Sequence, residues 1–136
     1  MNKFVRGGIV GAIAVSASVG VAPSAFATYH NNSCETLEVC AFKDVSFGGG
    51  MADMNMNNAA FSDDAYSSGG NAHDSVSSGF NVDHAVEYWQ DVNYAGIHFT
   101  LAKNFYDTSW GTNQPNANDY SFDFNDQVDS SKSYTT

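Results

Sequence analysis

The chain has 136 residues with 15 acidic and 5 basic side chains, so its formal net charge is −10. This balance argues against nucleic acid and anionic membranes as partners, because proteins bind both largely through Lys and Arg. It favours cations, basic partners or simple solubility. The length suits one domain with a modest core and is too short for two ordinary domains.

Residues 1–27 are typical of a secretory signal sequence. Lys3 and Arg6 supply a basic start, residues 9–22 are apolar or small, and residues 25–27 form a small-x-small cleavage site. A membrane anchor is the alternative, but the apolar stretch is shorter than the ~20 residues that a span requires. We therefore predict a secreted mature chain, residues 28–136, with no membrane partner; losing two cations takes its formal charge from −10 to −12.

Cys34 and Cys40 are the two cysteines of the chain. In an oxidising compartment such an isolated pair favours a disulfide, here closing a short loop at the edge of the fold. A free thiol pair or a metal site is the alternative. A loop this short stabilises by less than the ~3 kcal/mol expected for a 15-residue loop.

Helix signals are nearly absent, and β-branched or aromatic residues alternate with polar ones over short runs. In residues 97–101, for example, Ile97, Phe99 and Leu101 fall on one face of a strand. Gly-rich or Asn-rich connections separate the runs, the longest being 62–72 and 107–119. The pattern predicts strands near 37–43, 49–54, 59–61, 76–80, 85–90, 97–102, 105–107 and 128–134.

The chain contains an internal repeat. The pattern aromatic-x-Asp-Val-polar-aromatic-small-Gly occurs at 42–49 and again at 89–96, and each copy is followed by an Asp-containing element, at 73–78 and 125–130. Two separate modules of about 50 residues would bury too little core. We therefore predict an all-β sandwich of two Greek keys, with repeat one at about 34–82 and repeat two at about 83–136.

The first repeated element resembles the signature of the βγ-crystallin Greek keys, aromatic-x4-aromatic-x-Gly. It is met by Phe42, Phe47 and Gly49 and by Trp89, Tyr94 and Gly96. Glycine permits a backbone conformation that a Cβ would strain, and the aromatic side chains cover the bend. The resemblance implies a βγ-crystallin-like sandwich built from two folded hairpins.

The second repeated element is similar to the calcium sequence of that family, (Asn/Asp)-(Asn/Asp)-x-x-(Ser/Thr)-Ser. Carried over by position, the resemblance implies two crossed Ca²⁺ sites that each join both repeats. One would use Ser77, Asp126 and the carbonyls of Ser75 and Lys43; the other would use Asp129, Asp74 and the carbonyls of Gln127 and Gln90. The alternative is that these stretches are only turns.

Three residues near these sites depart from the family pattern or bring an unusual charge. Asp129 replaces a hydroxyl residue and adds a charge, while Lys43 puts an ammonium near the other site. His73 replaces the first amide or acidic residue, which weakens the turn that such a side chain braces.

The signal sequence, the Cys-x5-Cys pair and the following Phe-Gly-Gly together resemble the βγ-crystallin-type metalloproteinase inhibitors of actinobacteria. Members of that group generally carry more than one disulfide, and this sequence has no second cysteine pair to brace an inhibitory loop. The resemblance implies a monomer that binds a secreted metalloprotease. A calcium-binding structural or envelope-associated protein without a protease target is the rival hypothesis.

A copper site is a second metal hypothesis. If cleavage follows Ala27, the new amino terminus is Thr28, Tyr29 and His30, whose amine, amide and imidazole nitrogens suit square-planar Cu(II). Met51, Met54 and Met56 offer thioethers for Cu(I). The alternative is that the methionines pack in the core or lie on a mobile loop.

The sequence predicts a binding protein and no enzyme, because it lacks a nucleophile elbow, a His-Glu-x-x-His motif and a phosphate-binding glycine loop. Loops 107–119 and 62–72 are the candidate contacts with a partner. Trp110 on the first of them either inserts into a partner's cleft or folds back to cover the end of the sandwich.

Overall fold

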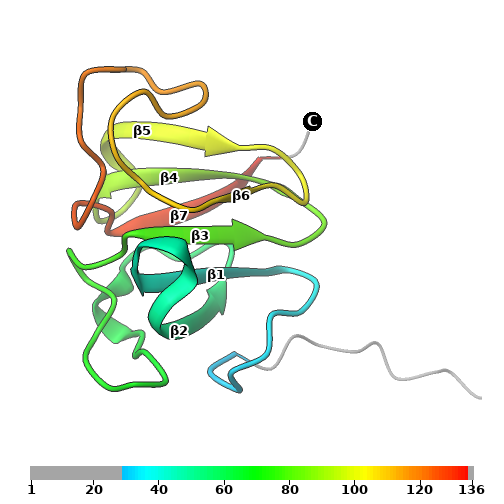
Figure 1. Ribbon diagram of the computed structural model, residues 1–136. Helices are drawn as coiled ribbons and strands as arrows, with labels where there is room; N and C mark the ends of the chain where they lie inside the picture. The colour runs from blue at the N-terminus through cyan, green and yellow to red at the C-terminus, as the bar shows by residue number, and fades with distance from the viewer. Residues whose placement is uncertain (1–28, 135–136) are drawn as a thin grey trace, which may run out of the picture.

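Residues 29–134 are described by the computed structural model, and they form two antiparallel sheets that pack face to face (Figure 1). One sheet has the order β2-β1-β3-β6, with β1 at Glu38–Asp44, β2 at Gly48–Asn55, β3 at Ser78–Asn81 and β6 at Tyr106–Asp107. The other has the order β5-β4-β7, with β4 at Ala85–Asp91, β5 at Ala95–Leu101 and β7 at Ser130–Tyr134. Two 3-10 turns are η1 at Val45–Phe47 and η2 at Phe61–Asp63. The predicted all-β sandwich is confirmed.

Each repeat contributes a segment to the sheet of the other. Strand β6 of the second repeat pairs with β3 of the first through Gly79 and Phe80. In return, Asn58 of the first repeat forms a bridge with Ser131 of β7. Because of this exchange neither repeat has a complete sheet without the other.

The strand predicted at 59–61 is wrong, since only the bridge at Asn58 is extended pairing. Two local features explain the difference. The Asn58 Oδ1 accepts a hydrogen bond from the Ala60 N–H at 3.1 Å, which turns the chain. Phe61 then enters the core with no exposed surface and begins η2.

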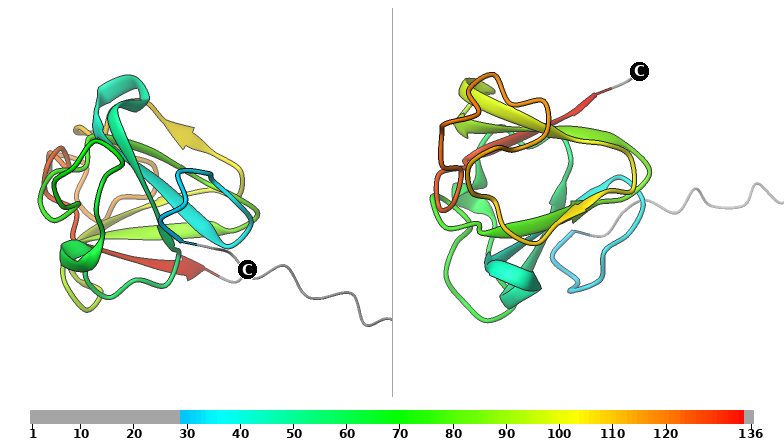
Figure 2. Two further views of the ribbon diagram at one scale, coloured as in Figure 1. Left: turned by 90° about the horizontal axis from the view of Figure 1, so that it is seen from below. Right: turned by 45° about the horizontal axis from the view of Figure 1, so that its top comes forward.

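The core lies between the sheets, where alternate residues of each strand point inward. Burying these apolar side chains is the main favourable term in folding. The strands supply Val39, Ala41, Ala52, Met54, Val86, Tyr88, Phe99 and Leu101, and the loops supply Phe61, Val76, Trp110, Phe124 and Val128. The long segment between β6 and β7, orange to red, runs along one end of the sandwich (Figures 1 and 2).

Trp110 is part of this core, so of its two predicted arrangements the folded-back one is confirmed and the partner-contacting one is wrong. Its ring is fully buried, 4.6 Å from the Tyr88 ring and 5.3 Å from the Phe99 ring between centroids. Opposite it lies Gly79, where a Cβ would stand 2.6 Å from Trp110 Cζ2. Burying the large area of an aromatic side chain in a small core contributes much to stability, which favours the folded-back arrangement.

The amino-terminal edge of the described chain is tied to β1 and β2. The predicted disulfide between Cys34 and Cys40 is formed, with Cα atoms 5.9 Å apart. The Asp53 carboxylate accepts hydrogen bonds from the backbone N–H groups of Asn31 and Asn32 at 2.7 and 3.2 Å. The predicted signal sequence lies outside the described residues. Between residues 29 and 134, no helix is long and apolar enough to cross a membrane.

Candidate functional site

The two repeated sequence elements meet in space through a serine. In the first repeat, the Ser78 hydroxyl donates to the Asp44 carbonyl at 2.6 Å and accepts from the Phe47 N–H at 3.0 Å. In the second, Ser130 makes the equivalent bonds to the Asp91 carbonyl at 2.6 Å and from the Tyr94 N–H at 3.1 Å. These bonds fix each folded hairpin beside the loop that carries the predicted calcium ligands.

The first crossing between the repeats joins Ser77 and Asp126. The Ser77 hydroxyl donates to Asp126 Oδ1 at 3.1 Å, and the Asp126 N–H donates to the Val76 carbonyl at 3.0 Å. The Phe42 carbonyl accepts from the Ser77 N–H at 2.9 Å, which places Lys43 one residue from this contact. Two predicted ligands from different repeats therefore lie within hydrogen-bonding distance.

The second crossing joins Asp74 and Asp129 through a backbone donor. Asp129 Oδ1 accepts from the Asp74 N–H at 2.9 Å, and the Asp129 N–H donates to the Trp89 carbonyl at 2.9 Å, one residue before Gln90. Asp74 and Asp126 have matching left-handed backbones, with φ of 45° and 56°. Of the other predicted ligands, Ser75 is half-buried and Gln127 is exposed. Binding of Ca²⁺ at either crossing stays a prediction.

His73 contacts two carboxylates, which its sequence position did not indicate. Its Nδ1 lies 2.5 Å from Asp129 Oδ1, and its Nε2 lies 3.5 Å from Asp74 Oδ2. Its sequence position indicated only a weakened turn. The available signal was the crossed pairing that the family resemblance implies, because it brings Asp129 to the element that begins with His73.

His30, one residue of the predicted copper site, is engaged elsewhere in the fold. His30 Nε2 lies 2.7 Å from Asp64 Oδ1, and the His30 N–H donates to the Asp53 carbonyl at 3.2 Å. Tyr29 is exposed, and Thr28 lies outside the described residues. Met54 and Met56 are buried in the core, as the alternative interpretation of the methionines expects, and Met51 is half-buried. Copper binding stays a prediction.

Loop 62–72 is a braced turn with an exposed apex. An isolated β-bridge between Ala65 and Asn71 closes its base. Tyr66 beside it is buried, and its hydroxyl oxygen lies 3.0 Å from Ser75 Oγ. Burial raises the pKa of Tyr66 to about 12, so the phenol is neutral at physiological pH. Gly69 and Gly70 at the apex have left-handed backbones, and no side chain or backbone atom lies within 4 Å of where their Cβ atoms would be.

Loop 107–119 is anchored more deeply. Gln114 and Ala117 are buried together with Trp110, and the Gln114 Nε2 donates to the Ser109 carbonyl at 3.0 Å. The loop therefore serves mainly as a cap on the core and presents fewer free side chains than its length suggests.

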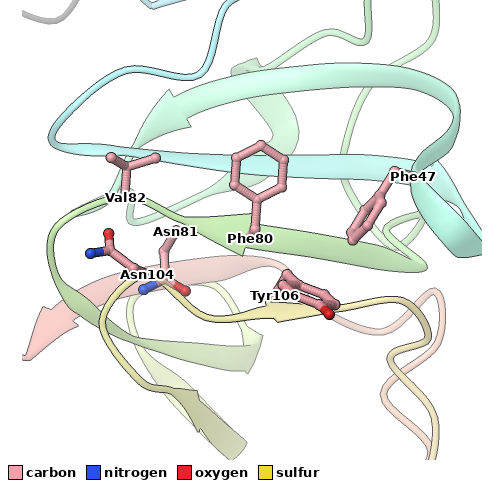
Figure 3. A pocket seen from close by; sticks show the side chains of 6 residues that line it. All are labelled: Phe47, Phe80, Asn81, Val82, Asn104 and Tyr106. Atoms are coloured by element: carbon pink, nitrogen blue, oxygen red, sulfur yellow. The ribbon is translucent and has the colours of Figure 1, made fainter.

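An aromatic surface pocket of about 310 Å³ lies on the outer face of β3 and β6 (Figure 3). The side chains of Phe80 and Val82 point to the same side of β3, and Tyr106 is 63% exposed beside them. No sequence pattern indicated this pocket. The period-2 pattern of β3 and β6 shows which residues leave the core, but it does not show that the two strands are neighbours. Its lining residues are Phe47, Phe80, Asn81, Val82, Asn104 and Tyr106.

A family model described as peptidase inhibitor family I36 matches residues 27–101, more than half of the chain. The chain belongs to peptidase inhibitor family I36. The matched segment runs through β5, so it contains loop 62–72 and both folded hairpins but excludes loop 107–119. No curated protein matches this I36 chain.

Solved βγ-crystallins share the fold of this I36 chain. A domain solved in work on the evolution of the eye lens βγ-crystallin fold has a TM-score of 0.58 at 20% identity and covers 80% of this chain and 97% of its own. A βγ-crystallin from an archaeon has a TM-score of 0.54 at 20% identity and covers 74% of this chain and 100% of its own. A βγ-crystallin from Ciona intestinalis has a TM-score of 0.52 at 18% identity and covers 71% of this chain and 99% of its own. At these identities the likeness shows the architecture alone.

Proposed function

We propose that this I36 chain is a secreted inhibitor of a metallopeptidase. The family match over residues 27–101 carries the proposal. It supports a peptidase as the partner, and the resemblance of the Cys-x5-Cys entry and Phe-Gly-Gly hairpin to metalloproteinase inhibitors narrows the class. An inhibitor needs a surface segment that enters the enzyme's cleft.

Loop 62–72 is the contact that the geometry favours. It lies inside the family match, whereas loop 107–119 lies outside it and buries its tryptophan. The Ser67 N–H donates to the Met51 carbonyl at 2.8 Å, and the Ser68 hydroxyl donates to the Gly49 carbonyl at 2.5 Å. A loop held in one conformation loses less entropy on binding, which improves affinity. The apex from Ser67 to Asn71 is exposed, so its residues are accessible to a partner.

The test is inhibition of a panel containing a thermolysin-like metallopeptidase, a serine peptidase and a cysteine peptidase. We expect inhibition of the metallopeptidase alone. Gly69→Asn adds a side chain where nothing lies within 4 Å, and Asn tolerates a left-handed backbone. It should weaken inhibition by about tenfold or more, equivalent to ~1.4 kcal/mol.

Thr112→Asn, at an exposed position of loop 107–119, is the matched control and should inhibit like the parent. Absence of inhibition of every metallopeptidase at micromolar protein would refute the proposal. Loss of inhibition in Thr112→Asn with Gly69→Asn unaffected would move the contact to the other loop.

A calcium-stabilised structural protein is the second candidate, favoured by the two crossings. At Ser77 and Asp126 the facing atoms are oxygens, the donors that Ca²⁺ prefers. An ion there would link segments 49 residues apart and stabilise the folded state. Thermal unfolding with Ca²⁺ or chelator tests this: the melting temperature should rise with Ca²⁺, and Asp126→Ala should abolish the rise. A melting temperature indifferent to millimolar Ca²⁺ would exclude this role.

A further inference from the structure

We propose that His73, Asp74 and Asp129 bind a first-row transition-metal cation, with Zn²⁺ as the probe, in preference to Ca²⁺. The cluster occupies the second crossing between the repeats, and it is the group of at least three His, Cys, Asp or Glu side chains within residues 29–134 whose donor atoms gather closely enough for a shared ion. The proposal does not depend on peptidase inhibition, since it concerns a different set of side chains and a ligand that can be tested alone.

The donor atoms are already close together. One ligand atom from each of the three residues lies within 4.8 Å of the others. The His73 ring stands between the carboxylates, with Nδ1 at 2.5 Å from Asp129 and Nε2 at 3.5 Å from Asp74. Zinc lies about 2.0–2.2 Å from nitrogen and oxygen ligands, so ligand atoms around one ion are roughly 3 Å apart. Small side-chain rotations would open the present contacts to that spacing.

One ligand is fixed while the other two can adjust. The Asp129 side chain is 8% exposed and is held by the Asp74 N–H at 2.9 Å. The His73 and Asp74 side chains are 47% and 53% exposed, so an ion can reach them from solvent. Their backbone is nevertheless set, because the His73 N–H donates to Asn71 Oδ1 at 2.8 Å. This arrangement reduces the ordering needed on binding and leaves open positions for water.

The imidazole decides the selectivity. Ca²⁺ takes six to eight oxygen ligands, whereas imidazole suits Zn²⁺, Cu²⁺ and Ni²⁺. The first crossing offers an internal comparison: Asn125 stands where His73 stands, and its Nδ2 donates to Asp126 Oδ2 at 3.0 Å. The two crossings of one chain thus differ by a nitrogen ligand. The competing explanation is a protonated imidazole that only pairs with the carboxylates.

Titration calorimetry with ZnCl₂ on the purified protein, its His73→Asn variant and a His84→Asn control tests the proposal. His73→Asn installs the side chain found at Asn125, and His84 lies outside the cluster. We expect the control to bind Zn²⁺ like the parent and His73→Asn to bind it at least about tenfold more weakly, since even outer-shell changes cost about 10–100-fold in metal affinity. Calcium affinity at this crossing should not fall in His73→Asn.

Two spectroscopic readings identify the ligand atom. Co²⁺ should give visible d–d absorption in the parent and less in His73→Asn, and Zn²⁺ should shift the ¹⁵N resonance of the ligating His73 ring nitrogen. Circular dichroism checks that each variant is folded, and Asp74→Asn, at an exposed side chain, serves as a second variant that should also weaken Zn²⁺ binding. Equal Zn²⁺ affinity in the parent and both cluster variants, or an unchanged His73 resonance, would overturn the proposal.

Discussion

At the scale of single residues, the contact between Gly79 and Trp110 shows how a strand position depends on a distant loop. The Trp110 ring packs on the β3 backbone at Gly79, and a Cβ there would also lie 2.9 Å from the Cys40 carbonyl oxygen. Neither neighbour is a flexible side-chain end, so neither can move away cheaply. The glycine is required here by close approach and not by a left-handed backbone.

Gly79→Ala should therefore destabilise the protein by about 1–3 kcal/mol, the usual cost of overpacking. Urea unfolding measures this free energy. Gly111→Ala is the matched control, because the nearest atom to its Cβ would be Asp123 Oδ1 at 4.0 Å. It should be neutral or slightly stabilising. Equal stabilities of the two variants would contradict the packing argument.

Glu38 is an ionisable residue in a buried environment, which disfavours its charged form. It has no exposed surface; its Oε2 accepts from the Glu35 N–H at 2.8 Å, and its Oε1 has no hydrogen-bond partner among the described residues. Burial raises the pKa of this carboxyl above its ordinary value of 4.5, with a smaller contribution from the Asp53 charge. The folded state therefore holds the Glu38 proton more tightly than the unfolded state does.

It follows that Glu38 costs stability as the pH rises from 4.5 through its raised folded pKa, because the unfolded chain releases this proton first. Glu38→Gln keeps an oxygen for the Glu35 N–H and cannot ionise. Urea unfolding of the parent and variant at pH 4, 5.5 and 7 should show the variant gaining relative stability as pH increases. A pH-independent difference would mean that Glu38 ionisation is not coupled to folding.

At the scale of elements, the two folded hairpins share the same local backbone conformation. In β1–β2 and β4–β5 the positive φ values fall at corresponding positions, Ser46, Phe47 and Gly49 in the first and Asn93, Tyr94 and Gly96 in the second. A Cβ at Gly49 would lie 2.5 Å from Asp44 Oδ2, and one at Gly96 would lie 2.6 Å from Asp91 Oδ2. The repeated Asp and Gly are thus packed against each other, which accounts for their joint recurrence.

Ser78→Ala and Ser130→Ala should each cost about 1–3 kcal/mol, because each removes the hydroxyl that pairs a hairpin N–H and carbonyl. Ser131→Ala is the control: Ser131 is equally buried, but its hydroxyl has no partner among residues 29–134. Its loss should be neutral or stabilising. Urea unfolding midpoints measure the stability of the three variants. A loss of stability in Ser131→Ala as large as in the other two would contradict the role given to the Ser78 and Ser130 hydroxyls.

At the scale of the whole molecule, the exchange of segments makes the two repeats one folding unit. Strand β6 completes the first sheet, and the bridge at Asn58 ties the first repeat to β7. The two crossings also join the repeats, through hydrogen bonds between residues 49 and 55 positions apart. A cation bound at either crossing would therefore stabilise both repeats together. The acidic surface also favours faster association with a basic partner surface.

The sequence by itself determined the two-repeat all-β architecture, because alternation, turn residues and the duplicated aromatic-Gly pattern are local and recur at a fixed spacing. It placed seven of its strands within about two residues of observed ones for the same reason. It also indicated the pairing of Cys34 with Cys40, since two cysteines leave a single intramolecular partner.

Only the tertiary structure decided which residues meet across the repeats. The burial of Trp110 and the aromatic pocket both depend on packing between distant segments. His73 is the sharpest example. A local pattern treats it as a weak turn residue, while its carboxylate partner Asp129 lies 56 positions away and is brought within 2.5 Å by the crossing of the two Greek keys.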